Sequence, residues 1–173
     1  MNETKLKIRT WPDPILRKKC NRVDKVTDDI RDILEEMRIL MHIHNGIGLA
    51  ANQVGLNLAL VVCETQGRLL KLVNPAISQM QGQIQFGEGC LSFPGIELTV
   101  KRAEKIFVEA LNEYGTPIKF WANETTAVVL QHEIDHINGI PFIYRVSTWH
   151  RLKVAPMLKE LKKKYGLSKP TKK

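Results

Sequence analysis

The chain has 173 residues, of which 43% are hydrophobic and 25% are charged, and its formal net charge at pH 7 is +8. This length suits one domain that buries a substantial core, and the composition is ordinary for a soluble globular protein. No stretch approaches the roughly 20 consecutive apolar residues of a membrane helix, so the sequence excludes a protein that crosses a bilayer by helices.

The N-terminal part of the sequence predicts an irregular segment followed by a helix. Its first 20 residues lack the apolar core of a signal peptide and the Ser-rich pattern of a transit peptide, so a cytosolic protein is expected unless a targeting segment was removed. Two prolines favour an irregular lead-in over residues 10–20. An apolar stripe with acids in its first turn predicts a helix over residues 27–46, which Asn45-Gly46 ends.

Short β-like runs come next, and Gly, Pro and Asn separate several of them as hairpins require. A helix is then predicted from Asn123, as its cap, to Asn138-Gly139, and a last helical region from Ser147 to about Tyr165, disturbed by Pro156. This order predicts an α+β fold, with short antiparallel β-sheets around a central helix, an N-terminal helix and a C-terminal helical tail. The predicted strands are residues 58–63, 69–75, 96–100, 105–111 and 117–122.

The positive charge is concentrated at the C-terminal end. Residues 151–173 carry nine Lys or Arg side chains and one acid, which accounts for the whole net charge of +8. We therefore divide the chain into one domain over residues 1–150 and a basic helical tail over 151–173, part of the same domain or partly disordered. Such a tail is able to contact phosphate backbones, including ribosomal RNA, by counterion release. The alternative is a solvated helix that only aids solubility.

The stretch "QHEIDH" (131–136) has the residue types of a metal site on a helix. His132 and His136 are four residues apart and lie on one face, so both can bind one ion. Glu133 follows the first histidine, where its carboxylate reaches a water molecule at the metal and serves as a general base. The alternative is a helix with two unrelated histidines and an exposed acid, because such short motifs recur by accident.

The third ligand is absent from the places where zinc peptidases have it. Phe142 stands where a metzincin has its third histidine, and the one downstream glutamate, Glu160, lies in the basic tail. Cys90 is one of three cysteines that we expect to be free thiols in a reducing compartment, and its Gly and Pro neighbours predict a tight turn. A Cys-His-His site with a fourth position for water is then favoured over an inert Cys90 thiol.

Three stretches together resemble the signature motifs of the peptide deformylases, in the order found in that family. They are "GIGLAANQ" (46–53), "EGCLS" (88–92) and "QHEIDH" (131–136), and the resemblance extends over roughly residues 11–147. The resemblance implies removal of the formyl group from the initiator formyl-methionine of nascent bacterial or organellar polypeptides, with release of formate. N-formyl-methionyl peptides are the expected partners, without DNA or membrane.

The resemblance also assigns the site residues. It implies one divalent ion on Cys90, His132 and His136, with Fe²⁺ expected and Ni²⁺, Co²⁺ or Zn²⁺ able to substitute. The ion would lower the pKa of its water so that hydroxide attacks the formyl carbon, while Glu133 acts as general acid and base. The Gln53 side chain and the Leu91 backbone N–H would hold the formyl oxygen.

Six further residues are expected at the substrate. Gly46 and Gly48 would let an extended peptide approach the backbone, although both glycines could instead only end the preceding helix. Ile47, Val128 and Val129 would form an apolar slot for methionine, with ordinary core packing as the alternative for the valines. Gly89, which flanks Cys90, completes this set.

The surrounding residues hold both expected support and departures from the family pattern. Glu88 and Asp135 are candidates to orient the imidazoles, and Arg102 is a plausible counter-ion for one of them, with surface pairing the alternative for Asp135. Asn52 stands where the family often has proline or threonine, Glu124 where a glycine is common, and Ile137 where leucine is usual. None of these three is a ligand candidate, so catalysis is expected to persist.

Two other functions fit parts of the pattern. A zinc peptidase would bind its metal without Cys90, so Cys90→Ala separates it from a deformylase. A ribosome- or RNA-binding module with a structural metal would have a closed site of four ligands and no use for Glu133. Truncation of the tail would separate binding to the ribosome from hydrolysis of a small peptide.

Overall fold

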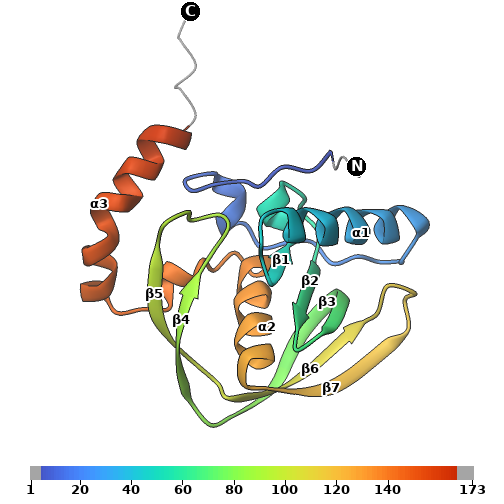
Figure 1. Cartoon of the computed structure of the whole chain (residues 1–173). Helices are drawn as coiled ribbons and strands as arrows, with labels where there is room; N and C mark the ends of the chain where they lie inside the picture. Colours follow the sequence, from blue (N-terminus) through green and yellow to red (C-terminus); the bar gives the residue numbers. More distant parts are fainter. Residues whose placement is uncertain (1–4, 167–173) are drawn as a thin grey trace, which may run out of the picture.

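The computed structural model describes residues 5–166 and has the predicted α+β architecture (Figure 1). Three α-helices, seven strands and three short 3-10 helices make up the described part. The helices are α1 (Asp28–Ile43), α2 (Glu124–Ile137) and α3 (Thr148–Tyr165), with 3-10 turns at η1 (Pro14–Arg17), η2 (Ala51–Val54) and η3 (Phe142–Tyr144). The strands are β1 (Gly48–Ala50), β2 (Leu60–Thr65), β3 (Arg68–Gln81), β4 (Ile84–Gly89), β5 (Glu97–Arg102), β6 (Lys105–Leu111) and β7 (Pro117–Asn123).

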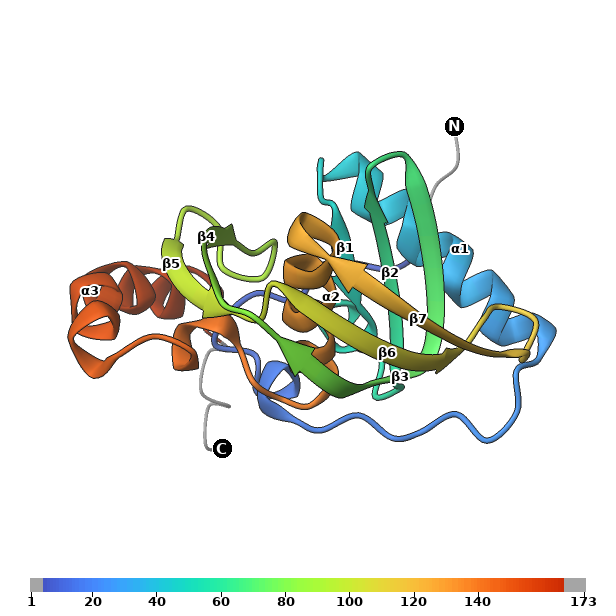
Figure 2. The ribbon, with the colours of Figure 1, turned by 90° about the horizontal axis from the view of Figure 1, so that it is seen from below.

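The strands form two antiparallel sheets around α2. Five strands pair in the order β1-β2-β3-β6-β7, and β4 pairs with β5 in a separate hairpin. Figures 1 and 2 show α2 between the large sheet and the β4–β5 hairpin, while α1 covers the β1–β2 end and α3 lies outside the hairpin. The central helix of the prediction is therefore the one that carries the two histidines.

Burial explains why α2 can hold polar groups away from water. Every residue from Ala127 to Ile137 is buried, because α2 packs against β1, β2 and β7 on one side and faces the hairpin on the other. The apolar stripe of α1 is also buried as predicted, at Ile30, Leu34, Met37, Leu40 and Met41. Helices α1 and α2 thus both pack their buried faces against the large sheet.

Strands β1 and β4 are absent from the sequence-based prediction. Both are rich in glycine, at Gly48 in β1 and at Gly87 and Gly89 in β4, and glycine weakens the β signal of a sequence. The tight turn at Cys90 is confirmed, because β4 ends at Gly89 and the Phe93 N–H donates to the Cys90 carbonyl at 2.9 Å.

The start of α2 corrects the predicted cap. Asn123 does precede the helix, but its side chain makes no capping hydrogen bond. The next residue, Glu124, has φ +48°, and its N–H donates to the Glu104 carbonyl at 2.8 Å. A left-handed backbone costs a residue with a side chain about 1–2 kcal/mol, so this departure from glycine places strain at the helix start.

Helix α3 begins where the last helical region was predicted, and Ser147 caps it by accepting a hydrogen bond from the His150 N–H; the helix continues through Pro156, where a disturbance was expected. Only Val154 and Leu161 of this helix are buried, against the small cluster that also contains Phe93 and Phe142. The rest of the predicted tail, residues 167–173, lies outside the described residues. None of the described helices is long and apolar enough to cross a membrane.

Candidate metal centre

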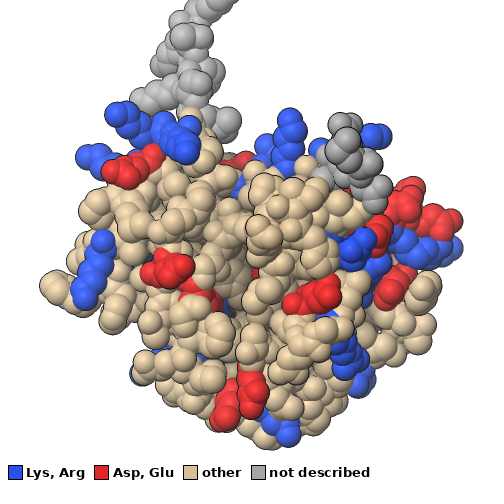
Figure 3. All heavy atoms as spheres, viewed as in Figure 1, with Lys and Arg blue, Asp and Glu red and all other residues tan. Residues whose placement is uncertain are grey.

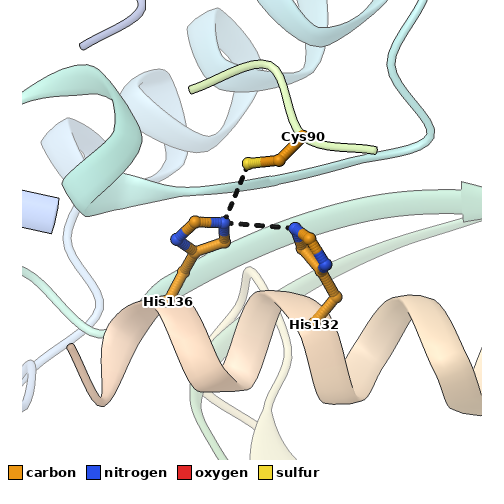
Figure 4. Close-up of side chains that lie close together, drawn as sticks. All are labelled: Cys90, His132 and His136. Atoms are coloured by element: carbon orange, nitrogen blue, oxygen red, sulfur yellow. Dashed lines mark hydrogen bonds between the residues drawn. The ribbon is translucent and has the colours of Figure 1, made fainter. Parts of the chain in front are cut away.

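Three metal-ligand side chains converge from two parts of the fold. His132 and His136 lie one turn apart on α2, and Cys90 follows β4 (Figure 4). The Nε2 atom of His136 is 3.2 Å from the Cys90 Sγ and 3.2 Å from the His132 Nε2, and all three donor atoms lie within 4.8 Å of one another. One thiolate and two imidazoles at this spacing fit a single divalent ion with a further position open.

The ring of His132 is oriented by buried charges. Its Nδ1 lies 2.8 Å from the Glu88 Oε2, and both Glu88 oxygens accept from the Arg102 guanidinium, at 2.7 and 2.9 Å. Although burial opposes ionisation, the hydrogen bonds from Arg102 and His132 lower the pKa of Glu88. The His132 Nε2 is thereby left to face Cys90 and His136.

Arg102 pairs with both candidate acids rather than with one. Its Nη1 donates to the Asp135 Oδ2 at 2.5 Å, and Asp135 also accepts from Arg145. Asp135 is buried, so the surface alternative for this acid is wrong. The network places two carboxylates and one guanidinium between the β4–β5 hairpin and α2, and so joins the two elements that carry the metal ligands.

Glu133 points into the same space without a pairing cation. Its Oε2 is buried and has no hydrogen-bond partner among the described residues. Burial raises the pKa of Glu133 to about 7, despite the opposing positive charge of His132. A carboxyl group that titrates near neutral pH is suited to both accepting and donating a proton.

Gly48 makes room for this carboxylate. A Cβ atom on Gly48 would overlap the Glu133 Oε1 and would lie 2.9 Å from its Cγ and Cδ. A Cβ on Gly46 would lie 3.0 Å from the Leu91 Cδ1. Neither glycine has a positive φ, so both serve close approach rather than an unusual backbone, and the sequence alone did not indicate that Gly48 lies against Glu133.

Gln53 also contacts the cysteine. Its Oε1 accepts from the Ala50 N–H at 2.8 Å, which fixes the amide so that its Nε2 points to the Cys90 Sγ at 3.4 Å and the Ser92 Oγ at 3.3 Å. The Leu91 side chain packs against the apolar cluster that contains Leu40, Met41 and Leu49, which anchors the turn after Cys90. Gln53 and Leu91 therefore both border the space in front of the three ligand atoms.

A cavity of about 510 Å³ opens at these residues, and Figure 3 shows a hollow at the centre of the same face. Val128 and Val129 line it and are almost fully buried, and Val129 also belongs to the main core cluster. Phe86 and Pro94 line it as well; sequence reasoning assigned neither to the site, Phe86 because β4 was not predicted and Pro94 because it was taken only as a turn residue beside Cys90. The expected substrate residues that line the cavity are Gly46, Ile47, Gly48, Gly89, Val128 and Val129.

The comparison with known families identifies the family of this chain. The model of the polypeptide deformylase family matches residues 5–152. The chain belongs to this family. A peptide deformylase of Aquifex aeolicus (strain VF5) is 39% identical over 82% of this chain and 87% of its own length. A chloroplastic peptide deformylase 1B of Oryza sativa subsp. japonica is 39% identical over 94% of this chain and 63% of its own length.

Solved deformylase structures share the fold as well. The crystal structure of a peptide deformylase from Legionella pneumophila superposes with a TM-score of 0.86 at 36% identity, over 95% of this chain and 99% of that chain. The family assignment made from the three motifs is thus confirmed. As a member of this family, the chain is a hydrolase. The family is metal-dependent and removes the N-formyl group from nascent peptides.

Proposed function

We propose that the chain hydrolyses the formyl group of N-formyl-methionyl nascent peptides with one divalent ion held by Cys90, His132 and His136. The observation that carries the proposal is the convergence of the Cys90 Sγ with two Nε2 atoms at the edge of a cavity. A mixed thiolate and imidazole set accepts several first-row ions, so Fe²⁺ is the expected metal and Ni²⁺, Co²⁺ or Zn²⁺ can replace it. When bound, such an ion lowers the pKa of water toward neutrality and polarises a carbonyl.

Glu133 is the proton carrier in this proposal. Its buried carboxylate has a pKa of about 7, so at neutral pH it can take the proton of the attacking water. The same group then delivers that proton to the departing amine, which leaves formate and a free amino terminus. Since no described side chain is paired with its Oε2, the carboxylate keeps the basicity that a salt bridge to a side chain would remove.

Gln53 and Leu91 stabilise the oxyanion that forms at the formyl carbon. The Gln53 amide is fixed by the Ala50 N–H and directs its donor toward Cys90, which supports this role for its Nε2. The Leu91 backbone N–H follows Cys90 directly in the turn after β4. The loss of one such donor typically costs on the order of 3 kcal/mol in transition-state stabilisation.

The apolar part of the cavity receives the methionine side chain. Ile47, Val128 and Val129 line it on one side, and Phe86 lines it from the hairpin. Gly46 and Gly48 on one edge and Gly89 on the other would let the peptide main chain come close enough to pair as an added strand. Selectivity for methionine would then come from the slot, and affinity from the backbone.

The basic tail is proposed to contact the ribosome, while residues 1–150 carry the catalysis. The last turn of α3 carries Lys162, Lys163 and Lys164. Figure 3 shows Lys and Arg side chains gathered over this end of the helix. Residues 167–173, which add three more lysines, lie outside the described residues. The proposed location is the bacterial cytoplasm, and an organelle would fit the similarity to the chloroplastic rice enzyme.

The decisive test is release of formate from a short N-formyl-methionyl peptide. The protein is purified without oxygen and loaded in parallel with Fe²⁺, Ni²⁺ or Zn²⁺, and Glu133→Gln serves as the control. Metal-dependent release that Glu133→Gln abolishes supports the reaction and the proton carrier together. Bound metal without formate release in all three forms would contradict the proposal. Metal binding that survives Cys90→Ala would favour a peptidase site instead.

A further inference from the structure

Asn52 and Gln53 are neighbours in η2, and their side chains reach two different residues of the proposed metal group, His136 and Cys90. Gln53 points to Cys90 at the front of the site. Asn52 is fully buried, and its Nδ2 donates to the backbone carbonyl of His136 at 2.5 Å. That carbonyl also accepts from the Gly139 N–H at 2.9 Å, so it does not need Asn52 to satisfy it. Asn52 is thus a buried amide whose donor bonds a carbonyl that already has a partner. We therefore expect a further role for its other polar atom.

Two polar atoms of these same residues have no partner among the residues that the structure describes. They are the Oδ1 of Asn52 and the Nδ1 of His136, and both are buried. Because the His136 Nε2 faces Cys90 and His132, its neutral ring carries the proton on Nδ1 and must donate there. The amide oxygen of Asn52 can only accept. The two atoms are therefore complementary, and they belong to residues already joined by a hydrogen bond.

We propose that Asn52 is a positioning residue for His136, acting on its backbone and on its ring at once. The Nδ2 group holds the His136 carbonyl, and the Oδ1 accepts from the His136 Nδ1–H through one buried water molecule. A water in a polar pocket with two to four partners satisfies both otherwise unpaired atoms. The inference rests on the proposed role of His136 as a metal ligand.

The two imidazoles are thus oriented by different means. A ligating histidine usually donates its second N–H to a carboxylate, a carbonyl or a water, and this bond fixes the tautomer and the ring direction. His132 has the charged Glu88–Arg102 pair for this purpose. For His136 the structure offers instead the neutral Asn52 amide, which already holds its backbone carbonyl. A neutral partner keeps the Nε2 lone pair free without adding charge.

The test compares Asn52→Ala and Asn52→Thr with the matched control Asn57→Ala. Asn57 is a partly buried asparagine five residues on, whose Oδ1 is also unpaired and which does not line the cavity. Co²⁺ is titrated into each metal-free protein against a chelator, and kcat and KM for formate release are measured on the loaded forms. We expect Asn52→Ala to weaken Co²⁺ binding about 10-fold and to lower kcat at nearly constant KM. Asn52→Thr keeps a hydroxyl donor and should regain most of the affinity.

A second measurement reads the ring directly. In the Zn²⁺ form with ¹⁵N-labelled histidine, the Nδ1–H of His136 should exchange slowly with solvent in the wild type and faster in Asn52→Ala. Equal Co²⁺ affinity and equal exchange in Asn52→Ala and Asn57→Ala would overturn the inference. If Asn52→Ala does not fold, Asn52→Leu, which removes both amide atoms at a similar side-chain volume, gives the same comparison. A wild type that binds Co²⁺ but releases no formate would instead contradict the proposed function, which keeps the two failures apart.

Discussion

Two clusters of acidic and basic side chains in this molecule differ in burial, one being half-exposed and the other buried. On α1, Glu35 accepts from Arg38 and Lys71 in a half-exposed cluster. Between the hairpin and α2, Glu88 and Asp135 share Arg102 in a buried one. The exposed cluster can be lost with little effect because water replaces its partners, whereas the buried one orients a proposed ligand and has no such substitute. Glu133, buried and unpaired, is a third case.

The largest effect is expected from removing the cation of the buried cluster. Arg102→Met leaves the Glu88 and Asp135 carboxylates buried without their shared partner, which should cost about 3–5 kcal/mol of unfolding free energy. Urea unfolding at pH 7 measures it, and Lys101→Met is the matched control because Lys101 is the exposed neighbour on the same strand. Equal losses in the two variants would show that the buried cluster is worth no more than a surface charge.

Activity should respond most to the glycine beside the unpaired acid. Gly48→Ala forces the Glu133 carboxylate to move, because the new Cβ would overlap its Oε1. A displacement of about 1 Å at a reacting group costs on the order of 100-fold in rate, so kcat/KM should fall by about that factor. Co²⁺ affinity should stay nearly constant, since Glu133 is not a proposed ligand.

A double-mutant cycle sharpens this prediction. In a Glu133→Ala background the carboxylate that the new Cβ would strike is gone, so Gly48→Ala should cost nothing further in stability or Co²⁺ affinity, both of which can still be measured without activity. An additive loss in the double variant would mean that Gly48 serves the substrate or the β1 backbone rather than Glu133.

The sequence predicted those parts of the site that depend on local spacing. His132 and His136 share a helix face by their separation of four residues, and Cys90 follows from the missing downstream ligand and the turn residues around it. Arg102 was predicted as a counter-ion for Glu88 or Asp135, but its contact with both could not be predicted, because glycines hid β4 and nothing local pairs Glu88 with Arg102. For the same reason the contact of Gly48 with Glu133 and the part of Phe86 in the cavity emerged only from the folded chain.

A smaller effect is expected from Glu124, because its backbone conformation is unusual for a residue with a side chain. Glu124 is exposed and has φ +48°, so Glu124→Gly should relieve backbone strain. The greater freedom of glycine in the unfolded chain offsets part of the gain, which leaves about 0.5–1 kcal/mol of added stability. Glu124→Ala keeps the Cβ and removes the charge. A gain of the same size in the alanine variant would assign the effect to charge and contradict the strain.

The smallest effect should come from the exposed cluster on α1. The hydrogen bond from Arg38, followed by that from Lys71, lowers the pKa of Glu35 from 4.5 to about 2. A lowered folded-state pKa stabilises the protein above the unfolded value, so the contribution is full above pH 4.5 and disappears as the pH falls toward 2. Because the Glu35 side chain is 42% exposed, solvent screening reduces the contribution to about 0.5 kcal/mol. Urea unfolding of Glu35→Gln and wild type should therefore differ by this amount at pH 7, less at pH 3, and less again in 1 M salt. If the difference in unfolding free energy increased at lower pH, or did not depend on salt, this cluster would behave like the buried one. The contrast between the two clusters would then be wrong.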